Sequence, residues 1–160
     1  MLEINSPVGN IFLDEEFDEL KSKNFERLMI SRMELEKRIL RRKTDRGTDI
    51  GLNLDPGVKL HHGDIIKNGE TKIVVEQLPE KVVSVRLKTK SIETMVLLGH
   101  IIGNMHRPIS IQKEEILFPI QADSEKETFT KLFQNIINYI EMTIEEKIFS
   151  PHSGADIHEH

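Results

Sequence analysis

The feature that most limits the fold of this chain is the dense spacing of tight-turn signals in its first half. Between residues 26 and 77 such signals occur at 45–47, 55–57, 62–64 and 68–69, and they leave only short apolar runs between them. Short runs rich in β-branched residues predict strands. The Asn68-Gly69 pair predicts a β-hairpin, because a type I′ turn needs residues that tolerate positive φ. Residues 26–78 are therefore expected to form a small β-rich domain.

The second half of the chain alternates strand and helix patterns. Ser91 is expected to cap an amphipathic helix that stops at Gly103-Asn104. Ser124 with Glu127 is expected to form the capping box of a second helix, whose apolar side runs from Phe129 to Ile140. Strands are expected at residues 82–87, 108–112, 115–120 and 142–149. The resulting βαββαβ order predicts a ferredoxin-like domain over residues 80–149, and an α+β fold class for the chain. This topology hosts many functions, so it identifies none.

The two ends of the chain have weaker patterns. Residues 1–25 are expected to form an extension in which Asp14 to Leu20 is either a short acidic helix or mobile, and residues 150–160, SPHSGADIHEH, are expected to form a flexible tail. No basic stretch followed by an apolar run begins the sequence, so the protein is expected to be cytoplasmic and to have no membrane segment.

The composition limits the chemistry. The 160 residues include no Cys, which excludes disulfides, thiolate zinc sites and iron–sulfur clusters, so any metal must be held by His, Asp or Glu. The net charge of −5 argues against nucleic acid as a partner. One basic run, from Lys37 to Arg46, is interleaved with apolar residues. We interpret it as the solvated side of an amphipathic strand, with an anionic docking patch as the alternative.

The seven histidines fall into three places: His61 and His62, His100 and His106, and the tail residues His152, His158 and His160. Neutral imidazole is the commonest protein ligand for nickel, copper and zinc. The clustering therefore predicts a metal-binding protein. The tail is the clearest signal, because three flexible histidines beside acidic groups have no packing role.

His100 and His106 should not chelate one ion within one chain. Residues six apart on a helix differ in direction by roughly 240°. His106 lies past the predicted helix stop, and a nearby two-fold axis would let two copies of it meet at one ion. His100 is expected to pack inside the apolar helix, and His61 and His62 to lie in a solvated loop, with weak metal affinity as the alternative.

The segment MVLLGHIIGNMHRPISI resembles the signature of the nickel metallochaperones called urease accessory protein E. The stretch ISRMELEKRILRRKTDRGTDIGLNLDPGVKLHHGDII is similar to the amino-terminal half of that family, and the resemblance covers about residues 26–150. It implies a β-rich docking domain, a metal-binding domain that forms a homodimer, and Ni²⁺ held across the two-fold axis by His106. The implied auxiliary ligands are His152, His158 and His160, and the implied partners are the urease apoprotein and the urease maturation GTPase. Met105 departs from the Arg that many members have.

Other classes of protein compete with this interpretation. The main alternative is a protein-interaction module in which metal binding is incidental or involves another ion, such as Zn²⁺ or Cu²⁺ in vitro. A metal-assisted hydrolase is disfavoured, because the chain has no Gly-x-Ser-x-Gly, His-Glu-x-x-His or phosphate-loop motif, and we expect no enzymatic activity. A ferredoxin-like RNA binder is disfavoured because residues 82–87 offer no aromatic side chain for base stacking.

Overall fold

The computed structural model describes residues 1–17, 25–69 and 71–152. The chain divides into two compact units, Met1–Leu78 and Pro79–His160. The structure mixes helices with several sheets, as the α+β prediction requires. Among the described residues, no helix is long and apolar enough to cross a membrane.

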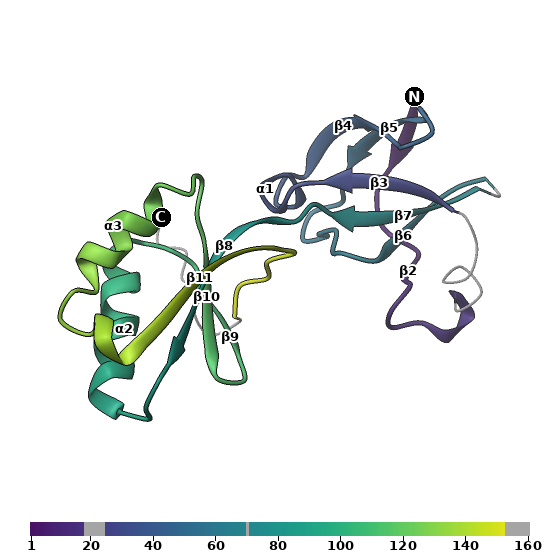
Figure 1. Cartoon of the computed structure of the whole chain (residues 1–160). Coiled ribbons are helices and arrows are strands. Elements are labelled where there is room, and N and C mark those ends of the chain that lie inside the picture. Colours follow the sequence, from purple (N-terminus) through teal and green to yellow (C-terminus); the bar gives the residue numbers. More distant parts are fainter. Residues whose placement is uncertain (18–24, 70, 153–160) are drawn as a thin grey trace. The chain divides into compact units, whose positions relative to one another are not determined.

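The described part of the first unit contains two small sheets, the short α-helix α1 (Arg32–Leu35) and a 3₁₀ turn at residues 15–17. Its strands are β1 (Leu2–Ile4), β2 (Gly9–Asn10), β3 (Glu26–Ile30), β4 (Ile39–Lys43), β5 (Asp49–Asn53), β6 (Asp64–Asn68) and β7 (Thr71–Gln77). One sheet has the order β1-β5-β4 and the other the order β2-β6-β7-β3 (Figure 1). The pairs β1–β5 and β3–β7 are parallel, and the remaining neighbours are antiparallel.

The two sheets of this unit share one core. Leu40, Ile50 and Leu52 from the first sheet belong to the same buried cluster as Leu28 and Ile73 from the second. Ile65 of β6 and Val74 of β7 face the other way. They form a second buried cluster with Ile11 and Phe17 of the amino-terminal segment. The second sheet is therefore covered on both faces, by the first sheet and by residues from the amino-terminal segment.

The turn signals located the strand ends well. Gly47, Gly57 and Gly63 all have positive φ, as the predicted turns require. The hairpin of β6 and β7 is also present, but Asn68 pairs with Thr71, so the loop is shifted one residue beyond the expected Asn68-Gly69 centre. Within residues 1–25 the structure has the strands β1 and β2, and residues 15–17 of the expected acidic helix form a 3₁₀ turn, while residues 18–20 of that helix lie outside the described residues. These strands are too short to show a period in the sequence.

The second unit has the predicted succession of elements. They are β8 (Glu80–Leu87), α2 (Ile92–Asn104), β9 (Ser110–Gln112), β10 (Glu115–Pro119), α3 (Glu125–Leu132), the 3₁₀ helix η2 (Ile137–Tyr139) and β11 (Ile140–Lys147). The strands form one antiparallel sheet in the order β11-β8-β10-β9. Both helices lie on the same face of this sheet (Figure 1).

Alternation along β8 explains how the helices are held. Val83 and Val85 face the helices and join Leu98 of α2 and Phe129 of α3 in one core. Val82 faces the opposite side, where it packs with Leu117 and with Phe149, a residue beyond the end of β11. The segment after β11 therefore returns across the open face of the sheet.

The second helix differs from its prediction. The sequence pattern extended the helix to residue 140, but α3 ends at Leu132, and the chain continues in tighter turns up to η2. Ser124 makes no side-chain capping bond, so the predicted capping box is wrong. The carboxylate of Glu125 instead accepts the backbone N–H groups of Gln121 and Ala122. The capping box that does form is Ser31 with Glu34, at α1.

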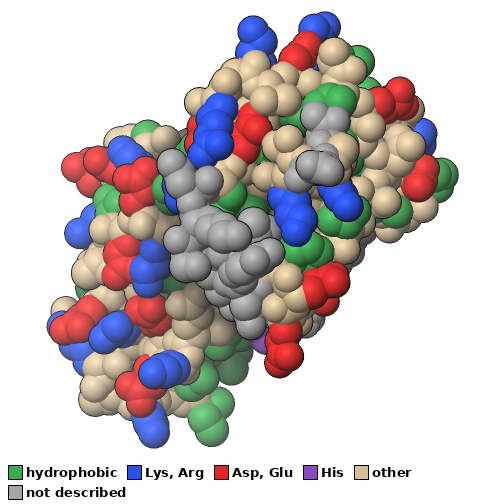
Figure 2. All heavy atoms as spheres, turned by 90° about the vertical axis from the view of Figure 1, so that its right-hand side faces the viewer, with side chains coloured by type: hydrophobic (Ala, Val, Ile, Leu, Met, Phe, Trp, Pro, Cys, Tyr) green, Lys and Arg blue, Asp and Glu red, His purple; other side chains and the backbone are tan. Residues whose placement is uncertain are grey.

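The basic run of the first unit lies on and around β4. Arg41 pairs with Asp49 across the strands at 2.6 Å, and Arg42 pairs with Glu34. Basic and acidic side chains are interspersed over the face of the molecule shown in Figure 2. These pairs favour the solvated-strand interpretation over an anionic docking patch.

Candidate metal-binding site

The candidate site lies at the carboxyl end of α2. The helix begins at the N-cap Ser91, whose hydroxyl accepts the N–H of Thr94 at 3.3 Å. Thr94, Leu98 and Ile102 recur at a spacing of four residues and are buried against the sheet. The buried stripe thus fixes the direction in which the last turn of the helix points. That turn carries the Gly103-Asn104-Met105-His106 sequence.

His106 is the first residue beyond the helix cap, and it has a left-handed backbone. Its φ is +55°, its N–H donates to the carbonyl of Gly103 at 3.0 Å, and the residue is exposed. Gly is the usual residue at this position of a helix end, because a Cβ atom disfavours positive φ. The chain therefore carries an imidazole here at some cost in backbone energy. The residue is exposed, so a ligand can reach it.

The helix that ends before His106 exposes apolar side chains along its length. Val96 is 63% exposed, Leu97 39% and Met105, the C-cap, 37%. A Cβ atom built at Gly103 would meet nothing within 4 Å, so the helix surface there is open. Exposed apolar side chains along one helix are typical of a protein contact.

His100 does not have the packing role expected for it. The residue is exposed, and its Nε2 lies 3.2 Å from the Nδ2 of Asn104 one turn later. The expectation of a buried histidine is therefore wrong. It failed because the apolar residues of α2 are more numerous than its buried stripe, so an apolar context did not mean burial.

His61 and His62 are not equivalent. The side chain of His61 is 74% exposed and lies 3.7 Å from Asp64. The Nδ1 of His62 accepts the N–H of Gln77 at 3.1 Å, and its ring lies 5.4 Å from the ring of Phe12. A neutral imidazole whose Nδ1 accepts a hydrogen bond carries its proton on Nε2, so neither nitrogen is free for a metal. His62 is a structural residue of the first unit.

The tail begins near the His106 segment. The N–H of His152 donates to the carbonyl of Ile109 at 2.7 Å, and His152 is exposed. His158 and His160 lie outside the described residues. Among the described residues, no group of three or more His, Asp or Glu side chains could hold a metal ion. Within the described part of one chain, the candidate site therefore consists of His106. The predicted ligand His152 is tied by its backbone to Ile109, three residues after His106.

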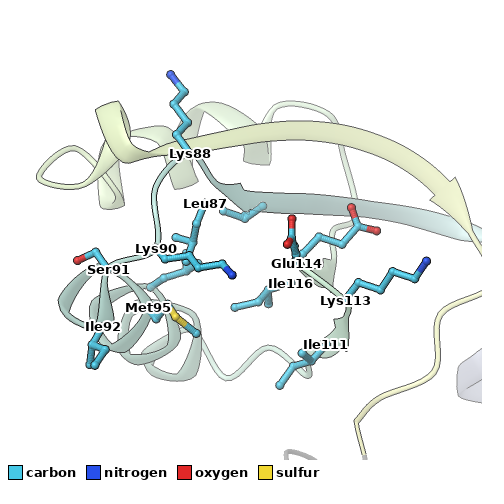
Figure 3. Close-up of a pocket in the computed structure, with 13 residues that line it drawn as sticks. Leu87, Lys88, Lys90, Ser91, Ile92, Met95, Ile111, Lys113, Glu114 and Ile116 are labelled. Atoms are coloured by element: carbon cyan, nitrogen blue, oxygen red, sulfur yellow. The ribbon is translucent and has the colours of Figure 1, made fainter.

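A cleft of about 540 Å³ lies elsewhere in the second unit, beside the amino end of α2. Figure 3 shows Ile92 and Met95 of the helix and Ile111 and Ile116 of the strands around it, while Lys88 points away. None of the predicted metal ligands lines this cleft.

Arg107 directly follows His106 and was not among the residues expected at the site. Its side chain contacts Pro119, Glu125 and Phe129 and so anchors this segment.

The fold and the site together define a two-unit α+β protein with an exposed histidine presented at a helix end. Residues 5–77 match the family model of the UreE urease accessory protein, N-terminal domain. Urease accessory protein UreE of Staphylococcus saprophyticus is 34% identical over 131 residues, which cover 80% of this chain and 82% of that protein. The protein of the same name from Staphylococcus epidermidis is 31% identical over 121 residues, covering 76% and 75%. That of Streptococcus vestibularis is 29% identical over 140 residues, covering 86% and 88%. The chain belongs to the urease accessory protein UreE family.

Proposed function

We propose that this protein is a cytoplasmic, homodimeric nickel carrier that delivers its ion during maturation of the urease active site. It acts on nickel as cargo and performs no catalysis. The observation that carries the proposal is His106, an exposed imidazole held at a helix end in a backbone conformation that would suit Gly better. A residue kept in an unfavourable conformation on the surface is typical of a functional site.

The second unit serves as the ferredoxin-like metal-binding domain and forms the dimer. A two-fold axis near the carboxyl end of α2 would bury the exposed Met105 and bring two copies of His106 together, and the exposed Val96 and Leu97 would extend the same contact along the helix. Two imidazoles leave a metal with open coordination positions. An incomplete site releases its ion more readily than the closed, four-ligand sites of structural metals, so it suits a carrier.

The tail histidines would complete or unload this site. Ile109, which bonds the backbone of His152, follows His106 by three residues, a span of at most about 10 Å. His152 therefore lies within reach of an ion at His106, and His158 and His160 follow it along the chain. The first unit, with its exposed strands, serves as the docking domain for the urease apoprotein and the urease maturation GTPase.

Calorimetric titration of nickel into the full chain, with the mass determined by light scattering, tests this function. The informative variant is His106→Gly, because Gly accepts the observed φ and removes only the imidazole. We expect about one tightly bound ion per dimer in the wild type, loss of that site in His106→Gly, and its retention in His100→Ala. Substituting His152, His158 and His160 together by Ala should lower the number of weaker ions bound.

Two outcomes would contradict the proposal. Undiminished tight binding in His106→Gly would move the site away from α2. A monomer that binds nickel only weakly would favour the alternative, a protein-interaction module with incidental metal binding. Competition with Zn²⁺ and Cu²⁺ belongs in the same series, because copper outranks nickel in intrinsic affinity for such ligands.

A further inference from the structure

Arg107, the residue directly after His106, links the segment that follows α2 to strand β10 and helix α3. Its Nη1 donates to the carbonyl of Pro119 at the end of β10 at 2.9 Å, and its Nη2 pairs with the carboxylate of Glu125 at the start of α3. The guanidinium also lies 5.6 Å from the ring centroid of Phe129. A planar, forked cation can make these contacts at once, whereas a lysine ammonium cannot.

The partners of Arg107 are themselves well held. Glu125 also accepts the N–H groups of Gln121 and Ala122, and the Arg107 hydrogen bond is the main cause of its lowered pKa. Phe129 is 1% exposed, and its ring centroid lies 4.5 Å from that of Phe118. The side chains of Arg107 and Glu125 are only 23% and 24% exposed. The anchor is therefore a partly buried network attached to the core of the unit.

The residue just before this anchor has little support of its own. Among the described residues, the backbone of His106 makes a single hydrogen bond, to Gly103, and its left-handed conformation is disfavoured for a residue with a Cβ atom. Such a conformation persists only where the surroundings determine it. On one side of His106 the surroundings are the end of α2, and on the other they are the contacts of Arg107.

We infer that Arg107 is a positioning residue: by binding Pro119, Glu125 and Phe129, it holds the backbone of His106 in the conformation that presents the imidazole to a metal. The link to nickel rests on the function proposed above, while the effect on the His106 backbone does not. Outer residues that orient a metal ligand typically change metal affinity by about 10- to 100-fold when they are removed. Two copies of the anchor act on one ion in a dimer.

The experiment compares Arg107→Met, Arg107→Lys and Glu125→Gln in the full chain. Arg86→Met is the matched control, because Arg86 also pairs with a glutamate of the same unit, Glu115, at 3.1 Å. Among the described residues, Arg86 makes no hydrogen bond or ion pair with the His106 segment. Each variant is measured for thermal midpoint, for the ¹⁵N order parameter of the His106 amide without metal, and for nickel affinity. The order parameter reports positioning directly, and a purely structural role would leave it unchanged in a folded variant.

In Arg107→Met we expect the order parameter of His106 to fall from about 0.85 toward 0.6 and the nickel Kd to rise by about 10-fold. Glu125→Gln should show a smaller change in the same direction, and Arg107→Lys should restore part of the loss. Arg86→Met should match the wild type in both measurements. If Arg107→Met fails to fold, Arg107→Lys and Glu125→Gln decide the question.

An unchanged order parameter of His106 in the folded variants would overturn the inference, as would an equal loss of order in Arg86→Met. A wild type without a tight nickel site would refute the proposed function, yet the order parameters would still decide whether Arg107 positions His106. An unchanged nickel Kd beside a loss of order would also overturn the inference, because positioning would then have no effect on the metal.

Discussion

His62 lies within a turn of the first unit and His106 just beyond a helix end of the second, and their surroundings differ. The ring of His62 accepts a backbone N–H and packs beside Phe12. His106 is exposed and has only a backbone hydrogen bond among the described contacts. The comparison shows that histidines that cluster in a sequence can have different roles in the structure. The difference lies in whether the ring nitrogens already have partners within the protein.

The largest effect on stability that tests this comparison is expected for His62→Ala. The change removes the acceptor of the Gln77 N–H and the contact with Phe12, which should lower the free energy of unfolding by about 1 to 2 kcal/mol. Urea denaturation measures the loss, and nickel titration should show unchanged affinity. His61→Ala is the control, since its 74% exposed side chain should contribute less than about 0.5 kcal/mol. A weakened nickel site in His62→Ala would break the comparison.

The opposite sign is expected for His106→Gly. Gly adopts φ near +55° without a steric penalty, although it also loses more conformational entropy on folding. We therefore expect the free energy of unfolding to rise by about 0.5 to 1 kcal/mol, measured by urea denaturation without metal. Lys113→Gly is the matched control. Among the described residues, Lys113 is the other non-Gly residue with positive φ, and the change should give a similar gain in the free energy of unfolding. A net loss in His106→Gly would show that the imidazole stabilises the fold.

The second unit does have polar groups with a structural role, and Glu115 is one of them. Its pKa is lowered chiefly by the hydrogen bond from the Ser84 hydroxyl, together with Arg86 and Lys147, against the effect of burial. Because its pKa is lowered in the folded state, Glu115 adds stability at pH values above its ordinary pKa of 4.5. This stability is lost as the pH falls through the lowered pKa. Glu115→Gln should cost about 0.5 to 1 kcal/mol at pH 7 and little at pH 3, as followed by denaturation at both values. A cost that does not change with pH would contradict this assignment.

The smallest effect is expected for His100→Ala. The residue is exposed on α2, and among the described residues its ring makes a hydrogen-bond contact with Asn104, so the free energy of unfolding should change by less than about 0.5 kcal/mol. Nickel affinity should be unchanged as well. Weaker nickel binding in His100→Ala would show that His100 also contributes to the metal site. His100 and His106 would then both stand on the ligand side of the comparison with His62.

Local chemistry in the sequence predicted much of the fold. Turn glycines with positive φ and the Ser91 cap located strands and the first helix, because each depends on residues close in the chain. The strands β1 and β2 could not be predicted, since two- and three-residue strands are defined by their pairing partners. The early end of α3 also escaped prediction, because the turns after Leu132 keep Phe133 and Ile136 buried at a similar spacing.

The candidate site was predicted less completely. Its histidine came from the Gly-Asn-Met-His motif and from the helix stop, which the structure places at Asn104. The positive φ of His106 and the contacts of Arg107 had no local signal, because Pro119, Glu125 and Phe129 lie 12 or more residues away along the chain. The exposure of His100 depended on which residues of α2 the sheet covers, and only the packed structure decides that.

The hydrogen bond between His152 and Ile109 has a further consequence for a carrier. In the carrier proposed above, it would hold the start of the tail a few residues from His106, and a later ligand of the tail would compete for the ion within the same chain. Short tethers give such intramolecular ligands effective concentrations on the order of millimolar. An ion leaving one imidazole would then meet the next before it met bulk water. Transfer could proceed by stepwise ligand exchange, without a free ion in solution.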